Sequence, residues 1–408
     1  MQENNPKVKV VLWLVASLTM LSGAAISASL PGISSHFLPP NPAGGEENEI
    51  LSRLILTIPA IAIAITAPFA GVIVHKFGRM KPLYIGLVLY ALFGVSGIFA
   101  ETIAQMLIGR VGLGVAVAVI MTVGTTLTGD YFQSEEERAK FMSMQGVFVT
   151  LSGVFFLSGG GLLSDLSWRA PFSVYFVSLA ILPLVILYLY EPPRPKETPT
   201  KQESSLFGAG GYWSAFPVFC VAFFTMVIFF IVPTQLPFLV METLGGSGKE
   251  TGLIMGTGPL FAAIASYNYN RLRRRFSLRE IYIFVCVSQG LGLAAVGFAS
   301  APWQLYAPFV LAGLGNGLAM ANAYIWFLQV AAPAKRAKLS GILTGSFFFG
   351  QFSSPLFVHP LLAFMSLNKV FSLFGAFLLI AALTLFIARP ALLRDARRGA
   401  DGKIHDEP

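Results

Sequence analysis

The sequence is divided into long runs that contain no Asp, Glu, Lys or Arg, and these runs constrain the fold more than any other feature. A helix that crosses the hydrocarbon core of a bilayer needs about 20 predominantly apolar residues. The run over residues 281–334 is long enough for two such helices, and Pro302 near its middle supplies the turn. The runs therefore predict twelve membrane-spanning helices, over residues 11–35, 54–74, 82–100, 111–129, 141–164, 170–190, 204–241, 251–270, 281–334 (two helices), 339–368 and 370–388.

The composition supports a membrane protein. Only 12% of the residues are charged, against about 25% in ordinary soluble domains, and 55% are hydrophobic. A chain with a mean hydropathy of +0.70 does not fold as one water-soluble globule. The runs lack the alternating pattern of barrel strands, so they predict an all-α membrane protein. Cys220 and Cys286 lie in apolar runs without a CxxC pattern, which gives no sign of disulfides or structural zinc.

Positive charges fall mainly on one side of the predicted helices. If the N-terminus is cytoplasmic, the cytoplasmic segments hold most of the 28 Lys and Arg residues. The positive-inside rule therefore predicts that both termini are cytoplasmic. The net charge of +8 is an orientation signal, and no basic stripe interleaved with aromatic residues points to nucleic acid. The run from Val10 to about Ile33 is too long for a signal-peptide core, so we expect it to remain as the first helix.

The chain reads as two halves. A polar stretch rich in Pro, Lys, Glu and Ser separates six predicted spans from six, which predicts a linker. We predict an N-terminal six-helix bundle over residues 1–190, a cytoplasmic linker over 191–211, a C-terminal six-helix bundle over 212–390 and a cytoplasmic tail over 391–408. The sequence Arg-Ala-Lys recurs at 138–140 and 336–338, and glycine-spaced stretches recur at 109–114 and 313–317. Such an offset of about half the chain suggests parallel repeats.

Short motifs resemble those of one family of membrane proteins. The loop after the second span reads Gly71-Val-Ile-Val-His75-Lys76-Phe77-Gly78-Arg79-Met80-Lys81. Its spacing resembles the G-x-x-x-D-R/K-x-G-R-x-K/R motif of the major facilitator superfamily, and the resemblance covers the whole chain. The stretch from Arg110 to Gly114 is similar to the family's R-x-x-x-G motif, and Asp130 followed by Arg138 is similar to its D-x(about 7)-R pattern.

The fifth span closes with a stretch similar to the G-G-x-L…W-R-x-P-F signature of drug/proton antiporter-type members. The matching residues are Gly160 to Leu162 and Trp168 to Phe172. The chain departs from the family at two places: His75 replaces the usual Asp, and Phe156-Leu157 stands where the antiporters have Gly-Pro. The replacement of Asp by His at position 75 removes a permanent negative charge from this motif.

The resemblance implies a conformational lock in which cytoplasmic charge pairs hold the two halves together in the outward-facing state. By position, Arg79 would pair with Asp130. The alternative is that the basic residues of this loop only determine topology. The expected lock residues are Gly71, His75, Lys76, Gly78, Arg79, Asp130 and Arg138.

The family architecture also implies a central substrate cavity between the two halves. Polar residues at membrane depth are costly, so those on the cavity helices are candidates for substrate contact. Each of them is equally suited to bonding a neighbouring helix. The candidates are Thr19, Ser22, Arg110, Thr225, Gln235, Phe261, Asn316, Met320, Asn322, Trp326 and Gln351.

All twenty acidic residues map to termini, loops or helix ends, so no buried carboxylate offers itself as a proton carrier. A cationic substrate would then lack a deep counter-charge, which favours neutral or anionic substrates. Arg110 is the one charge well inside a predicted span, and the resemblance links its family counterpart to proton transfer. Glu101, Glu242 and Asp130 are weaker candidates for proton coupling.

We therefore expect a secondary active transporter that exports a small amphipathic organic compound, coupled to protons, by alternating access in the inner membrane of a bacterium. Uptake or facilitated exchange of a metabolite is the alternative. A membrane enzyme is disfavoured because the four histidines are scattered and no HExxH, GxSxG or phosphate-loop motif is present. A non-transporting sensor is a further alternative. The expected partners are the substrate, protons and the bilayer; we expect no cofactor, no nucleic acid and a monomer.

Overall fold

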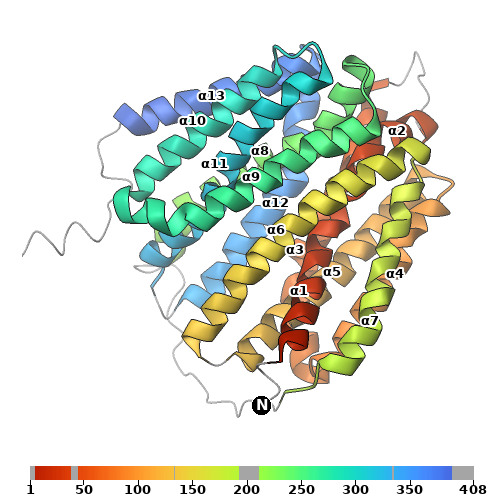
Figure 1. Cartoon of the computed structure of the whole chain (residues 1–408), viewed down its shortest axis with the longest axis vertical. Helices are drawn as coiled ribbons and strands as arrows, with labels where there is room; N and C mark the ends of the chain where they lie inside the picture. Colours follow the sequence, from red (N-terminus) through yellow and green to blue (C-terminus); the bar gives the residue numbers. More distant parts are fainter. Residues whose placement is uncertain (1–4, 38–44, 133, 193–210, 333–334, 388–408) are drawn as a thin grey trace, which may run out of the picture.

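The computed structural model describes residues 5–37, 45–132, 134–192, 211–332 and 335–387, and every regular element in these ranges is a helix (Figure 1). The all-α membrane fold predicted from the sequence is therefore confirmed. Prolines and polar caps begin several helices: Pro6 opens the first one, and Ser247 with Glu250 forms a capping box at another.

The first half of the chain contains six spans. Its elements are α1 (Pro6–Ala24), η1 (Ser27–Ser29), α2 (Leu30–Phe37), α3 (Gly45–Phe77), α4 (Met80–Val95), η2 (Ser96–Ile98), α5 (Ile103–Tyr131), α6 (Glu135–Leu166), η3 (Ala170–Phe176) and α7 (Val177–Tyr188). The elements α1, η1 and α2 follow one another as a single interrupted span over Pro6–Phe37.

The second half repeats this pattern. Its elements are α8 (Tyr212–Phe238), η4 (Leu239–Thr243), α9 (Gly248–Arg275), α10 (Leu278–Val296), η5 (Pro302–Leu305), α11 (Tyr306–Val330), α12 (Arg336–Leu362) and α13 (Leu367–Ile387). Pro302 opens η5 between α10 and α11, which is the division predicted for the long run over 281–334.

Ten of these segments are long and apolar enough to cross a membrane. The two other long helices are α9 and α12, with 28 and 27 residues. Both carry many Gly, Ser, Thr or charged residues, which lower their hydropathy. Both pack along spanning helices of each half, α9 on α6 and α11, and α12 on α3 and α8.

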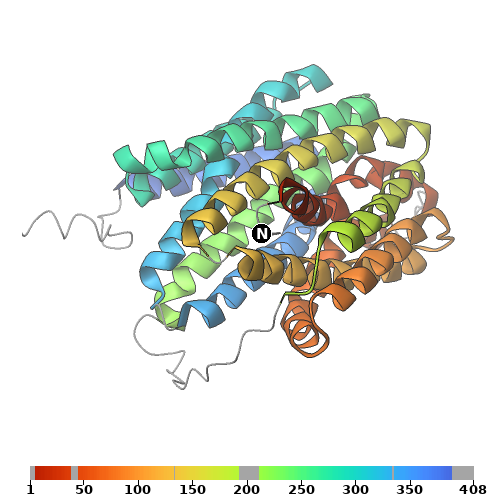
Figure 2. The same cartoon turned by 60° about the horizontal axis from the view of Figure 1, so that its bottom comes forward.

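The two halves form two groups of helices. The red-to-yellow helices of the first half lie together in Figures 1 and 2, and the green-to-blue helices of the second half lie beside them, with α6 and α9 running side by side between the groups. One buried apolar cluster fills the first group, and three smaller clusters fill the second. The bounds predicted for the two bundles, the linker and the tail stay predictions, since residues 193–210 and 388–408 lie outside the described residues.

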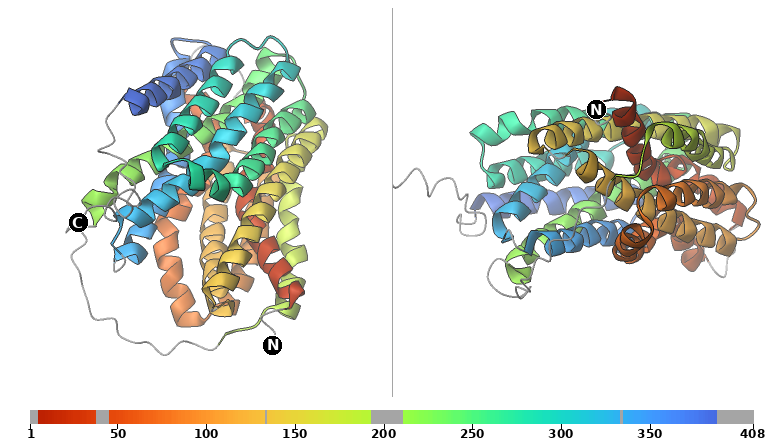
Figure 3. Two further views of the ribbon diagram at one scale, coloured as in Figure 1. Left: turned by 60° about the vertical axis from the view of Figure 1, so that its left-hand side comes forward. Right: turned by 90° about the horizontal axis from the view of Figure 1, so that it is seen from below.

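Four helices lie at the periphery. The helices α4 and α7 pack on other helices of the first half. The helices α10 and α13 pack on each other, and α10 also packs on α11. The remaining helices surround the middle of the molecule, where the halves face each other (Figure 3). Many large apolar side chains of the described residues are exposed, up to 85% for Phe298 and Phe364. Such a surface suits a lipid environment.

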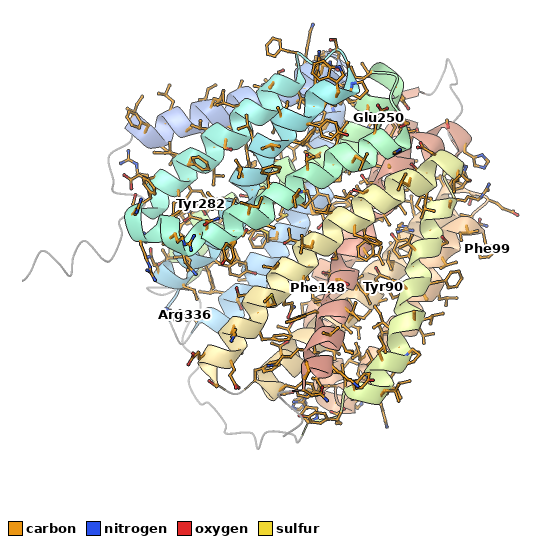
Figure 4. All side chains as sticks on the ribbon, viewed as in Figure 1. Tyr90, Phe99, Phe148, Glu250, Tyr282 and Arg336 are labelled. Carbon is orange, nitrogen blue, oxygen red and sulfur yellow. The ribbon has the colours of Figure 1, made fainter. Side chains whose placement is uncertain are left out.

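The two ends of the molecule differ in charge. The basic end carries the Lys and Arg clusters at residues 76–81, 271–279 and 335–338, and we call the opposite end the far end. Arg336 marks the basic end of α12 in Figure 4, and Glu250 marks the far end of α9.

Candidate functional site

The two halves are joined by polar contacts at the far end. The Ser27 hydroxyl in η1 donates to the carbonyl of Pro233 in α8. The Nε of Arg53 in α3 donates to Oε1 of Gln235 at 2.8 Å. The Arg53 guanidinium also lies 4.6 Å from the centre of the Phe238 ring. Because Arg53 is 4% exposed and Gln235 is 0% exposed, this contact is fully desolvated. We call these contacts and those of α6 with α9 the far-end seam.

The helices α6 and α9 form the second part of the seam. The Asp165 carboxylate accepts from the backbone N–H groups of Gly248 at 2.7 Å and Lys249 at 3.0 Å, so it caps the first turn of α9 from the other half. A Cβ added to Gly161 would lie 2.4 Å from the Gly248 carbonyl oxygen and 2.8 Å from the Gly252 Cα. Only glycine at position 161 allows the two backbones to approach this closely.

The seam also contains buried polar atoms without a partner among the described residues. They are the Ser29 hydroxyl, the Thr57 hydroxyl and the Gln235 Nε2. Ser29 lies two residues after Ser27, and Thr57 lies one helical turn after Arg53. The closed seam thus leaves part of its hydrogen-bonding capacity unused.

The basic-end portions of the facing helices are open by comparison. A Cβ added to Gly71 in α3, Gly146 in α6, Gly341 in α12 or Gly345 in α12 would meet no heavy atom within 4 Å. Met144 in α6 is 53% exposed. The far end is thus joined by polar contacts and close backbone packing, whereas these glycines of α3, α6 and α12 have open space beside them.

The loop motif at the basic end is organised by two carboxylates. The Nε of Arg79 donates to Oδ2 of Asp130 at 2.9 Å, which is the pair implied by the resemblance. The Glu191 carboxylate accepts from the backbone N–H groups of Arg79, at 2.8 and 3.0 Å, and of Met80, at 2.8 Å. Gly78 supplies the turn with φ of +85°, and a Cβ there would lie 2.8 Å from a Glu191 oxygen. All these contacts lie within the first half.

The other predicted lock residues lie around this network. Gly71, His75 and Lys76 are exposed, and Lys76 lies over the Phe77 ring. Arg138 is half-buried in the first turn of α6, and among the described residues its side chain makes no ion pair with Asp130. The action of these residues as a lock stays a prediction.

Replacing Glu191 by Gln should lower the melting temperature by about 2–4 °C, corresponding to roughly 1–2 kcal/mol. The amide has no negative charge at the N-terminus of α4, and it has only one oxygen to accept from the two N–H groups. Glu101→Gln is the matched control, because Glu101 is exposed and its side chain makes no hydrogen bond among the described residues. Thermal unfolding of the purified variants measures both; equal melting temperatures would contradict the capping role.

Arg110 lies inside the first half and does not face the second half. Its Nη1 donates to the Tyr175 hydroxyl at 2.9 Å, and its Nη2 donates to the Gly94 carbonyl at 3.3 Å. The guanidinium lies 4.8 Å from the Phe172 ring centre and 5.0 Å from that of Tyr175. With 1% exposure, Arg110 is not open to the space between the halves in this arrangement. Its membership in the substrate cavity stays a prediction.

Tyr175 connects Arg110 to the interruption of the first span. The Tyr175 hydroxyl donates to the Ser22 carbonyl at 2.7 Å, two residues before α1 ends. Ser27, which bonds across the seam, lies on the other side of this interruption. The buried arginine is thus linked through one tyrosine to the segment that positions a seam contact.

Several other cavity candidates have partners within their own half. The Thr19 hydroxyl donates to Ala16, and the Ser22 hydroxyl donates to Thr19. Asn322 accepts from the Tyr269 hydroxyl at 2.9 Å and donates to the Leu278 carbonyl at 3.0 Å. The Trp326 ring packs edge-on against Tyr282 at 5.9 Å. These contacts are helix-to-helix contacts, so the structure does not gather these residues into one site.

The remaining cavity candidates have polar atoms without a hydrogen-bond partner or side chains that are partly exposed. Gln235 lies in the seam, and Asn316 has an Oδ1 that is buried without a partner among the described residues. Met320 is 37% exposed. Thr225, Phe261 and Gln351 are half-buried. These residues stay candidates for substrate contact.

Sequence reasoning missed the seam residues Arg53, Asp165 and Ser27, and it missed Glu191 as an organiser of the loop motif. Arg53 and Asp165 border charge-free runs, so they read as loop or helix-end residues. The signal for Glu191 was available, because a helix N-terminus requires acceptors and Glu191 directly follows the sixth span. No described group of three or more His, Cys, Asp or Glu residues is arranged to hold a metal ion.

The fold and this site define a multi-pass helical membrane protein whose two halves meet in a seam at one end. The sequence profile of the Major Facilitator Superfamily matches residues 12–239 and 218–404. The chain therefore belongs to the major facilitator superfamily, a family of membrane transporters and not of enzymes.

Individual relatives have different printed functions. The chain is 28% identical over 194 residues to the arabinose-proton symporter of Escherichia coli K12, covering 47% of the chain and 39% of the symporter. The chain thus matches less than half the length of that relative. It is 25% identical over 284 residues to the bacillibactin exporter of Bacillus subtilis, covering 65% of the chain and 70% of the exporter.

A crystal structure of a D-xylose-proton symporter superposes with a TM-score of 0.77 over 95% of this chain and 98% of the symporter, at 16% identity. A likeness at this identity shows the fold alone.

Proposed function

We propose that the protein exports a small amphipathic organic compound, neutral or anionic, in exchange for protons by alternating access. The observation that carries the proposal is the asymmetry between the ends: polar contacts join the halves at the far end, whereas glycines on the basic-end portions of α3, α6 and α12 have open space beside them. Alternating access requires two such arrangements of the same halves around a central site.

Charge supports the orientation. The basic end carries the Lys and Arg clusters, so the positive-inside rule places it in the cytoplasm of a cell whose inner membrane holds the protein. The arrangement described above is then open to the cytoplasm, from which an exporter takes its substrate. Arg79 and Asp130, paired at this end, would take part in the lock when the basic end closes.

The buried charges support the substrate class. Among the described residues with resolved burial, the buried charged side chains are Arg53, Arg79, Arg110 and Lys335, and no Asp or Glu is buried. A cationic substrate would find no buried carboxylate there, whereas a neutral or anionic one meets no repulsion of that kind.

The direction of transport is supported by the bacillibactin exporter, which aligns over more of this chain than the arabinose-proton symporter does. The symporter favours a second candidate function, proton-driven uptake of a small metabolite. Both relatives move a small molecule, and the symporter's name includes the proton.

Accumulation of labelled amphipathic compounds in cells that express the protein tests the proposal. We expect lower accumulation of at least one neutral or anionic compound than in cells without the protein, and recovery on adding a protonophore. Arg110→Ala, made at equal expression, should also restore accumulation. Raised accumulation that the protonophore abolishes would contradict export and support uptake.

A further inference from the structure

One face of α9 joins an exposed apolar stripe to exposed arginines. Leu260, Ile264 and Tyr267 are 41%, 48% and 73% exposed. The same face continues into Arg271 and Arg274, both exposed. Spacings of three and four residues place these side chains one above the other on a helix.

This face is turned away from α11. The residues of α9 that meet α11 are Gly258, against Gly313, and Ser266, which donates to the Gly317 carbonyl at 2.6 Å. Gly258 lies two residues before Leu260, and Ser266 lies two residues after Ile264. An offset of two residues is about 200° around a helix, so the stripe lies opposite the α11 contact. The helix α9 lies on the near side of the molecule in Figure 1.

The arginines at the end of this face differ in their contacts. Arg279 donates to the carbonyls of Leu385 and Phe386 and so caps the end of α13. Arg273 donates to the Phe276 carbonyl. Arg274 and Arg275 are exposed and have no partner among the described residues.

The neighbouring acid, Glu280, caps the first turn of α10. The Glu280 carboxylate accepts from the Ser277 N–H at 2.7 Å and from its hydroxyl at 2.8 Å. Phe276, between the arginines and α10, is 45% exposed. Arg271 is exposed and donates to Oδ1 of Asn268 at 3.4 Å. An apolar face that ends in exposed guanidinium groups at the basic end suits a phospholipid, with the acyl chain along the helix and the phosphate at its end.

We propose that this face of α9 binds an anionic phospholipid, with the acyl chain along Leu260, Ile264 and Tyr267 and the phosphate at Arg271, Arg274 and Arg275. Guanidinium groups form paired hydrogen bonds with phosphate oxygens, and clusters of basic residues next to a membrane helix attract anionic headgroups. The site is independent of substrate transport and of its direction.

Titration of the purified full chain with phosphatidylglycerol tests this site, with phosphatidylcholine of the same acyl chains as the neutral lipid. Thermal unfolding and native mass spectrometry report stabilisation and retained lipid. Phosphatidylglycerol should raise the melting temperature and stay bound, whereas phosphatidylcholine and inorganic phosphate should do neither. The double variant Arg274→Gln, Arg275→Gln should need about tenfold more phosphatidylglycerol.

The matched control removes two charges elsewhere at the basic end. Lys140 in α6 and Lys338 in α12 are exposed, and their side chains make no contact among the described residues. The variant Lys140→Gln, Lys338→Gln should bind phosphatidylglycerol like the unaltered chain. The double variant Arg274→Lys, Arg275→Lys keeps the charges and should retain binding, which separates loss of charge from damage to the fold.

Three results would overturn the proposal. They are equal binding of phosphatidylcholine, an equal rise in melting temperature with inorganic phosphate, and an equal loss of phosphatidylglycerol binding in the Arg274→Gln, Arg275→Gln variant and the Lys140→Gln, Lys338→Gln variant. The last result would mean that phosphatidylglycerol binding depends on the total positive charge of the basic end and not on this face of α9.

Discussion

Replacing Gly161 by alanine should reduce transport at least about tenfold, because overpacking costs about 1–3 kcal/mol and each 1.4 kcal/mol changes an equilibrium tenfold. The added Cβ would lie 2.4 Å from the Gly248 carbonyl oxygen, and both atoms belong to packed helices that meet across the seam. The halves must separate at the far end to accommodate it. The measurement is the rate of protonophore-sensitive substrate movement at equal amounts of protein.

Gly159→Ala is the matched control on the same helix, because a Cβ at position 159 meets no heavy atom within 4 Å. Met255 is 3% exposed and lies beside Ser27, so the substitution Met255→Cys reports whether the seam has opened. In a background without Cys220 and Cys286, a membrane-impermeant maleimide should label this cysteine from the far end in Gly161→Ala and not in Gly159→Ala. Equal transport by both variants would contradict the role of the seam.

Replacing Arg110 by methionine should also reduce transport at least about tenfold, while the protein remains folded. The guanidinium holds Tyr175 and lies against Phe172, and hydrogen bonds to a charged group contribute about 1.5–3 kcal/mol each. Without it, the interrupted first span loses part of the support that positions Ser27. Arg110→Lys should fail as well, since a single ammonium group cannot reproduce the planar fork.

Tyr175→Phe tests the hydrogen bond from Tyr175 to the first span separately from the charge of Arg110. This variant keeps Arg110 but loses the hydroxyl that donates to the Ser22 carbonyl. If the connection carries the effect, Tyr175→Phe should slow transport by about tenfold or less, in line with one neutral hydrogen bond. Gel filtration and thermal unfolding establish that each variant is folded. Transport by Arg110→Met at the unaltered rate would contradict a functional role for this cluster.

The spans could be predicted from sequence because the cost of burying charge in lipid acts locally along the chain. The charge-free run over 111–129 lies inside α5, and the division of the run 281–334 falls at Pro302. The pairing of Arg79 with Asp130 was implied by the resemblance to the family's motifs. Local patterns thus predict the helices, together with one contact between helices that are consecutive in the sequence.

The seam could not be predicted in the same way. Ser27 and Pro233 are 206 residues apart, and Arg53 and Gln235 are 182 apart, so no local pattern joins them. The contacts of Arg110 could not be predicted either. Its helix has no marked polar face, so the sequence does not indicate which neighbouring helix the guanidinium contacts. Asn322 shows the same limit: its sequence position fits a cavity, and its amide bonds two helices of its own half.

The unpartnered Ser29, Thr57 and Gln235 atoms bear on how long the closed far end persists. Each such atom gives up hydration on closing and gains no bond among the described residues, at a cost of about 1–3 kcal/mol. These costs offset part of the stabilisation from Asp165 and Arg53. The closed arrangement is therefore less stable than one in which each of these groups is bonded. A seam with every group bonded would hold the two halves together for longer and so lower the number of cycles completed each second.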